Sequence, residues 1–258
     1  MGNRGRRRRR SNSNAWWKQE FGGLPVWAIA ASVALIGVLF AVPAVVSATA
    51  TPSAPYVRPT DAFDEPAPTT EAVRAVFVGD SYTYGTGASS PDTRWTTLAA
   101  EQAGWVEVNL GRGGTGYVTT SDVNGCGLAY CPNYQEMVTA VVEENPDVVV
   151  VAGGQNDFDE WAADPDAVTS AVAATLTGIR EGLPDARIIV VGPSTPGNVT
   201  DLVTGFAASV QEQAGLIGAT FVSLTDPPVL SPEMVGSDGA HVNDSGHQAI
   251  ADRVVAGL

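Results

Sequence analysis

Between residue 73 and the end of the chain, short apolar runs alternate with helical stretches. Each apolar run holds four to six mostly β-branched residues and stops at a glycine, a proline or a polar residue, which is typical of a buried strand. The runs cover residues 73–80, 105–111, 147–154, 186–193 and 219–224. Helices are expected at 93–103, 133–144, 165–182, 200–215 and 244–257.

Continuous apolar strands that alternate with helices indicate a parallel sheet whose two faces are both covered. We therefore predict that residues 72–258 form one α/β domain, a three-layer α/β/α sandwich with a central parallel sheet of about five strands. The helix at 165–182 has the clearest start, because Asp164 can cap it and Pro165 suits its first turn.

The N-terminal part of the chain has the pattern of a membrane segment. Residues 24–46 carry no charge and contain one polar side chain, and about 20 such residues span a bilayer as a helix. Arginines upstream of them make 1–23 a basic, cytoplasmic segment by the positive-inside rule. We expect 24–46 to be an uncleaved transmembrane signal anchor. The alternative is a cleaved signal peptide that ends at "ATA", residues 48–50.

In both cases the rest of the chain lies outside the cytoplasm, either membrane-anchored or secreted. Residues 47–71 are rich in proline, threonine and alanine and are typical of a linker. The chain has a net charge of −14 and no lysine after residue 50. A domain this acidic is not attracted to nucleic acid phosphates, so we expect a solvated surface and no nucleic acid partner.

The chain has two cysteines, Cys126 and Cys131 in "CGLAYC". An even pair in an oxidising compartment predicts a disulfide, which would staple a loop or, in the sharper interpretation, shape a pocket. A metal site would need further ligands, and the only histidines are His241 and His247. No metal site is expected.

Gly111, Gly113 and Gly116 have the G-x-G-x-x-G spacing of a dinucleotide-binding loop. Such a loop should open a helix, and an acidic residue should follow about 20 residues later at a strand end. The residues after Gly116 have no helical period, and the next strand starts only near Asp147. A nucleotide partner is therefore not expected.

The residues that follow the predicted strands share one kind of chemistry. Ligands of open parallel sheets bind beyond the carboxyl ends of the strands, so these residues should meet at one edge. They include a hydroxyl, an imidazole, a carboxylate, an amide and several glycines, which are the parts of nucleophilic acyl transfer. The strand exits carry Asp80 and Ser81, Asn109 and Gly111 to Gly114, Gln155 to Asp157, and, after a long loop, Asp238 and His241.

Four segments at these exits resemble, in the same order, the four blocks of the SGNH hydrolases, the GDSL-type lipases and esterases. They are "GDSYTYG" at 79–85, "NLGRGG" at 109–114, "GQND" at 154–157 and "DGAH" at 238–241. Tyr82 stands where the family name has leucine. The resemblance covers most of residues 73–257 and implies an SGNH, flavodoxin-like sandwich.

The resemblance also implies roles for individual residues. Ser81 would be the nucleophile, His241 the base, and Asp238 the carboxylate that orients the imidazole. The backbone N–H of Ser81, the backbone N–H of Gly114 and the side-chain amide of Asn156 would form the oxyanion hole. Gly113 is the alternative to Gly114, since the two glycines are adjacent.

The function implied is an extracytoplasmic serine esterase or lipase that needs no cofactor. Its substrate would be an O-acyl ester, either a short-chain lipid or an acetylated glycan, and its membrane contact would be the N-terminal helix. Two alternatives stay open at this point. One is an acyltransferase of the same fold, and the other is an inactive module that binds cell-wall carbohydrate.

Three other polar residues near these segments need an interpretation. We expect Asp80 to bond backbone donors near its turn, because a carboxylate next to the serine is badly placed to orient the histidine. His247 falls inside the last predicted helix and is interpreted as a helix histidine with no catalytic part. Asp157 is interpreted either as a partner that fixes the Asn156 loop or as a helix cap.

Overall fold

The computed structural model describes residues 20–21, 24–25 and 72–258. The chain divides into two units, Met1–Ala67 and Pro68–Leu258. All strand exits identified above belong to the second unit, which is described first.

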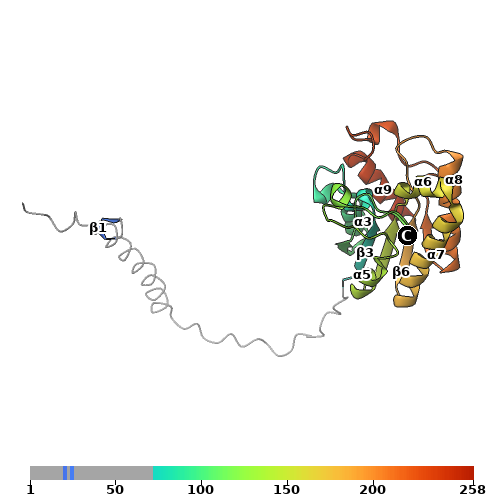
Figure 1. Ribbon diagram of the computed structural model, residues 1–258, viewed down its shortest axis with the longest axis horizontal. Helices are drawn as coiled ribbons and strands as arrows, with labels where there is room; N and C mark the ends of the chain where they lie inside the picture. The colour runs from blue at the N-terminus through green and yellow to red at the C-terminus, as the bar shows by residue number, and fades with distance from the viewer. Residues whose placement is uncertain (1–19, 22–23, 26–71) are drawn as a thin grey trace, which may run out of the picture. The chain divides into compact units, whose positions relative to one another are not determined.

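A five-stranded parallel sheet forms the centre of the second unit, as the sequence predicts (Figure 1). The strands are β3 (Arg74–Gly79), β4 (Val106–Asn109), β5 (Val148–Ala152), β6 (Arg187–Val191) and β7 (Thr220–Val222). Their order in the sheet is β4-β3-β5-β6-β7, the doubly wound order of flavodoxin-like folds. The direction of winding reverses between β3 and β5, where ligands of such sheets bind.

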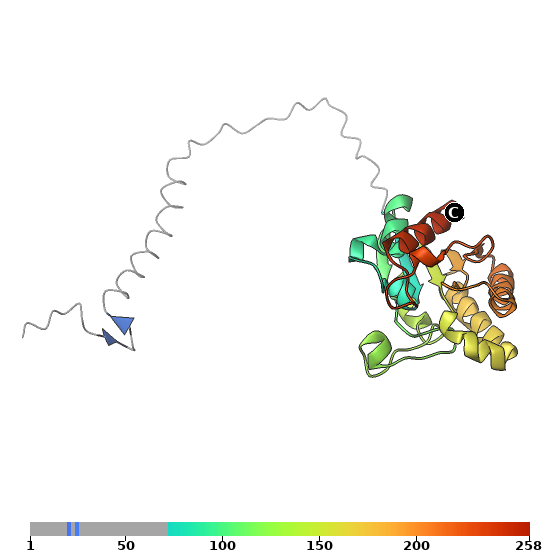
Figure 2. The same ribbon diagram turned by 90° about the horizontal axis from the view of Figure 1, so that it is seen from above.

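Two groups of helices cover the two faces and complete the three layers (Figure 2). Alternate residues of β5 show why both faces are buried: Val149 and Val151 pack into one core, and Val148 and Val150 into the other. The first core is closed by α5 (Val138–Glu143), α7 (Pro165–Gly182) and α8 (Asp201–Leu216), and the second by α3 (Trp95–Ala103) and α9 (Asp244–Ala256).

Most predicted helix limits agree with the structure to within two residues, and α7 has the predicted limits. Its N-cap Asp164 accepts a hydrogen bond from the N–H of Ala167. The prediction of a helix from residue 133 is wrong, because residues 133–137 form turns and the helix begins at Val138. Shorter helical turns are α2 (Ser81–Tyr84), α4 (Val123–Cys126), α6 (Phe158–Ala163), η2 (Pro91–Thr93), η3 (Gln155–Asp157) and η4 (Pro232–Met234).

In the first unit, β1 (Glu20–Phe21) pairs antiparallel with β2 (Leu24–Pro25). The predicted transmembrane segment 24–46 therefore starts with two strand residues, and the rest of it lies outside the described residues. Most of the basic N-terminus and all of the predicted linker, residues 47–71, also lie outside them. Among the residues that the structure describes, no helix is both long enough and apolar enough to cross a membrane.

Candidate active site

The candidate nucleophile lies at the exit of β3, one of the three inner strands. Ser81 is the first residue of α2, and Asp80 caps this helix by accepting a hydrogen bond from the N–H of Tyr82 at 2.9 Å. The N–H of Ser81 has no acceptor in the described part of the chain. This donor therefore points, unpaired, from the N-terminus of a helix, where partial positive charge favours an anion.

Ser81, His241 and Asp238 form one hydrogen-bonded row. The Nε2 atom of His241 is 2.9 Å from the Oγ atom of Ser81, and its Nδ1 atom is 2.6 Å from Oδ2 of Asp238. The other carboxylate oxygen accepts the N–H groups of Ala240 and His241, both at 3.0 Å. The backbone and side-chain hydrogen bonds from His241 hold the pKa of Asp238 well below its usual range. An ionised carboxylate only accepts, so Nδ1 carries the proton and Nε2 faces the serine hydroxyl as an acceptor.

Tyr82 holds the histidine turn against the helix of the serine. Its hydroxyl donates a hydrogen bond to the carbonyl of Ala240 at 2.8 Å, and its ring centroid lies 6.0 Å from that of His241. The residue after Ser81 is thus joined to the residue before His241. No such role was expected for Tyr82, because nothing in the sequence relates two positions 158 residues apart.

The two loops expected to supply the oxyanion donors are joined by a hydrogen bond. The amide Nδ2 of Asn156 donates to the carbonyl of Thr115 at 2.9 Å, which uses one of its two hydrogens. The N–H groups of Gly113 and Gly114 have no acceptor among the described residues. Both expected glycines therefore present free donors. Gly114 has a left-handed φ of 73°, which favours glycine, whereas Gly113 does not have a positive φ.

Asp157 also connects the same two loops by hydrogen bonds. Its buried carboxylate accepts the three consecutive N–H groups of 117–119 and the hydroxyl of Thr119, at 2.6 to 3.2 Å. It makes no capping bond to the helix that follows. Of the two interpretations of Asp157, the geometry favours the partner over the cap. Gly116 belongs to this arrangement, because a Cβ atom there would collide with the Asp157 carboxylate.

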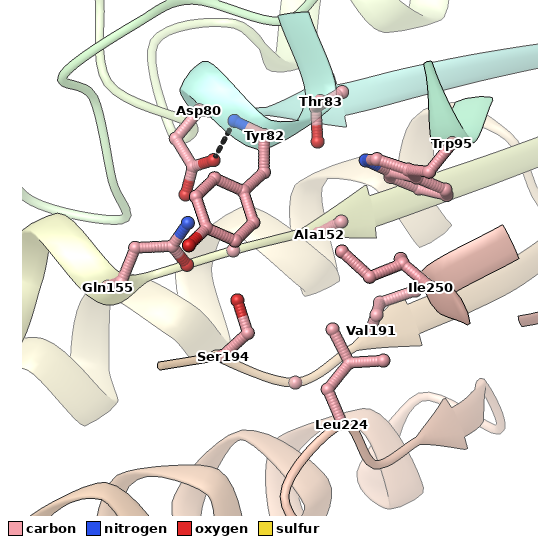
Figure 3. A pocket seen from close by; sticks show the side chains of 12 residues that line it. Asp80, Tyr82, Thr83, Trp95, Ala152, Gln155, Val191, Ser194, Leu224 and Ile250 are labelled. Carbon is pink, nitrogen blue, oxygen red and sulfur yellow. Dashed lines mark hydrogen bonds between the residues drawn. The ribbon is translucent and has the colours of Figure 1, made fainter. Parts of the chain in front are cut away.

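A small cavity lies beneath the serine helix, with polar ends of Asp80, Gln155 and Ser194 on one side and apolar side chains on the other (Figure 3). Its volume is about 10 Å³, the space of one water molecule. Within the described part of the protein, neither amide atom of Gln155 has a hydrogen-bond partner. Burial raises the pKa of Asp80 to about 7, against the hydrogen bonds from Tyr82 and Tyr134. The cavity has no room for a substrate.

His247 is buried and has a structural position, as expected. Its Nδ1 atom accepts the N–H of Trp95 at 3.3 Å, and its Nε2 atom donates to the carbonyl of Thr86 at 3.2 Å. Burial lowers the pKa of this imidazole. A neutral His247 thus satisfies the first N–H of α3 and joins α9 to it.

A stapled loop stands beside the expected oxyanion glycines. The predicted disulfide between Cys126 and Cys131 is present, and the backbone of Cys131 pairs with that of Ser121 in both directions. A Cβ atom on Gly113 would collide with the carbonyl of Gly125. The loop therefore packs closely on the Gly113 segment and forms one wall of a hollow of about 230 Å³. This supports the interpretation that the disulfide shapes a pocket.

Comparisons with known proteins bear on the family of this chain. Residues 77–249 match the GDSL-like Lipase/Acylhydrolase family. The GDSL lipase Rv0518 of Mycobacterium tuberculosis is 30% identical over 189 residues, which are 69% of this chain and 78% of that protein.

Solved structures with similar folds include TesA and Est24, both at low sequence identity. TesA has a TM-score of 0.57 at 19% identity, over 72% of this chain and 97% of its own. Est24, a carbohydrate acetylesterase from Sinorhizobium meliloti, has a TM-score of 0.54 at 18% identity, over 71% of this chain and 99% of its own. These likenesses show the fold, and the family match covers most of the chain. The chain belongs to the GDSL-like lipase/acylhydrolase family and is an SGNH ester hydrolase.

Proposed function

We propose that this protein hydrolyses O-acyl esters through an acyl-enzyme formed on Ser81, with His241 as base and Asp238 as the group that orients it. The observation that carries the proposal is the row of two short hydrogen bonds, 2.9 Å from Ser81 to His241 and 2.6 Å from His241 to Asp238. A hydroxyl, a base and an oriented carboxylate in this order are the parts of an activated serine nucleophile.

In the first half of the reaction, Oγ of Ser81 attacks the carbonyl carbon while Nε2 of His241 takes the hydroxyl proton. Asp238 stabilises the imidazolium that results. The carbonyl oxygen becomes an oxyanion, for which the N–H groups of Ser81 and Gly114 and the amide of Asn156 are the proposed donors. The carbon–oxygen bond to the alcohol then breaks, and His241 gives its proton to the departing oxygen.

In the second half, water replaces the alcohol. His241 takes a proton from the water while the water oxygen attacks the acyl carbon, and the same donors stabilise the second oxyanion. The bond between the acyl carbon and Oγ of Ser81 then breaks, Oγ takes the proton back from His241, and the carboxylic acid is released. An alcohol in place of water would turn the same steps into acyl transfer.

For the substrate, we propose a short-chain lipid ester or an acetylated glycan. The relative from Mycobacterium tuberculosis is named a lipase, and Est24 is named a carbohydrate acetylesterase. An inactive carbohydrate-binding module is the other candidate. The intact hydrogen bonds between Ser81, His241 and Asp238 argue against it, because a binding module needs no activated serine.

We further propose that the catalytic unit works outside the cytoplasm, anchored by residues 24–46 or released after their cleavage. The uncharged stretch at 24–46 and the arginines before it support an outward-facing domain. The disulfide of Cys126 and Cys131 also supports this location, since disulfides persist in oxidising compartments.

Labelling with a fluorophosphonate probe tests the proposed nucleophile. The purified protein should be labelled, and Ser81→Ala should abolish the label, because the probe reacts only with a serine whose proton can be removed. Ser170→Ala is the matched control, since this exposed serine of α7 only bonds its own helix backbone. A wild-type protein that is not labelled would exclude the esterase and favour the binding module.

A further inference from the structure

Arg112 differs from the other arginines of the catalytic unit. It forms no ion pair and no side-chain hydrogen bond with any residue that the structure describes, and its Nε atom is buried without a partner. A buried guanidinium nitrogen without an acceptor is costly, so such an atom is expected to meet one from a ligand. Nε of Arg74 is also buried without a partner, but its guanidinium pairs with Glu144. Arg94 pairs with Glu107, and Arg180, Arg187 and Arg253 donate to backbone carbonyls, so Arg112 alone among the arginines of the described unit has no partner for its guanidinium.

The surroundings of Arg112 suit an anion. It lines the hollow of about 230 Å³ described above, together with Tyr84, Cys126 and the glycines at 111, 113, 125 and 127. No carboxylate lines this hollow, although the chain has a net charge of −14. The planar fork of a guanidinium matches the paired oxygens of carboxylates and phosphates.

The hollow adjoins the candidate active site. The N–H of Arg112 donates to the carbonyl of Gly79 at 2.8 Å, two residues before Ser81. Tyr84 ends the helical turn that Ser81 begins, so the two Cα atoms are separated by a rise of only about 5 Å along the helix. Tyr84 is 63% exposed, and its ring can offer an apolar face at the rim. The hollow thus begins within one helical turn of Ser81.

We propose that the Arg112 hollow binds a carboxylate or phosphate group on the alcohol half of the ester. The enzyme should therefore prefer esters whose alcohol carries such an anionic group. The inference rests on the proposed ester hydrolysis at Ser81. The acetyl and short-chain acyl groups proposed above carry no charge, so an anionic group on such a substrate has to belong to the alcohol. Glycine backbone, Tyr84 and Cys126 line the rest of the hollow, and Arg112 is the one charged residue among the described residues that line it.

The test compares kcat/KM for two matched pairs of acetyl esters by acetate release. One pair is 1-acetylglycerol 3-phosphate and 1-acetylglycerol, and the other is acetylated glucuronic acid and acetylated glucose. The wild-type enzyme should prefer the anionic member of at least one pair by roughly tenfold or more. The pair with the larger ratio identifies phosphate or carboxylate as the group bound.

Arg112→Gln should lower kcat/KM for the anionic ester roughly 10- to 100-fold more than for its neutral partner. Arg112→Lys should fall between the two, because it keeps the charge and loses the fork. Arg187→Gln removes the same charge at the opposite end of the sheet, where β6 begins, and should leave the preference unchanged. In the unaltered enzyme, 0.5 M salt should weaken the preference, which needs no substitution to measure.

Equal losses on both esters in Arg112→Gln, or an equal loss of preference in Arg187→Gln, would overturn the subsite. Hydrolysis of both members of each pair at similar rates by the wild-type enzyme would also overturn it, while the proposed esterase function would stand. Hydrolysis of none of the four esters, together with no fluorophosphonate labelling, would overturn the esterase function and the subsite with it.

Discussion

Asp80 is buried next to the nucleophile and keeps its carboxyl group in the interior of the protein. Burial raises its pKa to about 7, whereas the unfolded chain should titrate near the ordinary value of 3.8. Between these two values the folded state holds a proton that the unfolded state has released. The contribution of Asp80 to stability therefore falls as the pH rises from about 4 to about 7 and stays low above that range.

Asp80→Asn should remove this dependence. Asparagine keeps the shape of aspartate and the oxygen that caps α2 by accepting the N–H of Tyr82, but its side chain does not ionise. Relative to the wild type, the free energy of unfolding of the variant should rise between pH 4 and pH 8 by on the order of 4 kcal/mol. Urea unfolding of both proteins at the two pH values measures this. A difference that is the same at both values would show that Asp80 ionises as in the unfolded chain.

At the residue scale, the sequence predicts best those side chains whose chemistry is written into a short motif. Ser81, Asp238 and His241 follow strand ends, and the structure brings them into one hydrogen-bonded row. The bond from Tyr82 to Ala240 and the unpaired state of Arg112 could not be predicted. Both depend on which loops, distant in the sequence, finally meet.

At the scale of elements, the candidate site lies on loops that a few side chains connect by hydrogen bonds. Asp157 makes the most of these bonds, and it connects the loop after Gly114 to the turn that carries Asn156. All four of its bonds reach into residues 117–119. Removal of this carboxylate would leave three backbone N–H groups without their acceptor.

Asp157→Ala should lower the free energy of unfolding by roughly 3–5 kcal/mol, because one buried and two partly buried backbone donors lose a charged partner. Thr119→Val is the graded control. It removes a single hydroxyl bond to the same carboxylate and should cost about 1 kcal/mol. Urea unfolding measures both changes. A loss below about 1 kcal/mol in Asp157→Ala would mean that the loops are held by other contacts.

Helix limits were predictable where a local signal marks them and not elsewhere. Asp164 and Pro165 mark the start of α7, and the structure agrees. The start of α5 was missed because residues 133–137 are held in turns, in part by the Asn133 side chain, which accepts the N–H of Glu136. The helix α6 was missed because its six residues are too few to show a helical period.

At the scale of the whole molecule, alternation of apolar runs and helices was enough to predict a parallel sheet covered on both faces. That alternation alone does not determine the order β4-β3-β5-β6-β7, because several windings satisfy it. The resemblance to the SGNH hydrolases supplied the flavodoxin-like order. That order places the exits of β3 and β5 at the centre of the sheet, where Ser81 and Asn156 follow them.

Both hydrophobic cores and every candidate site residue lie within the unit Pro68–Leu258. A fragment of residues 68–258 should therefore fold alone and hydrolyse neutral acetyl esters with a kcat/KM within about twofold of the full chain. In the expressing cell, the full chain should remain with the membrane fraction after an alkaline wash, and the fragment should not. A full chain in the wash supernatant would contradict the anchor. A secreted product whose mass lacks residues 1–50 would establish the cleaved signal peptide in its place.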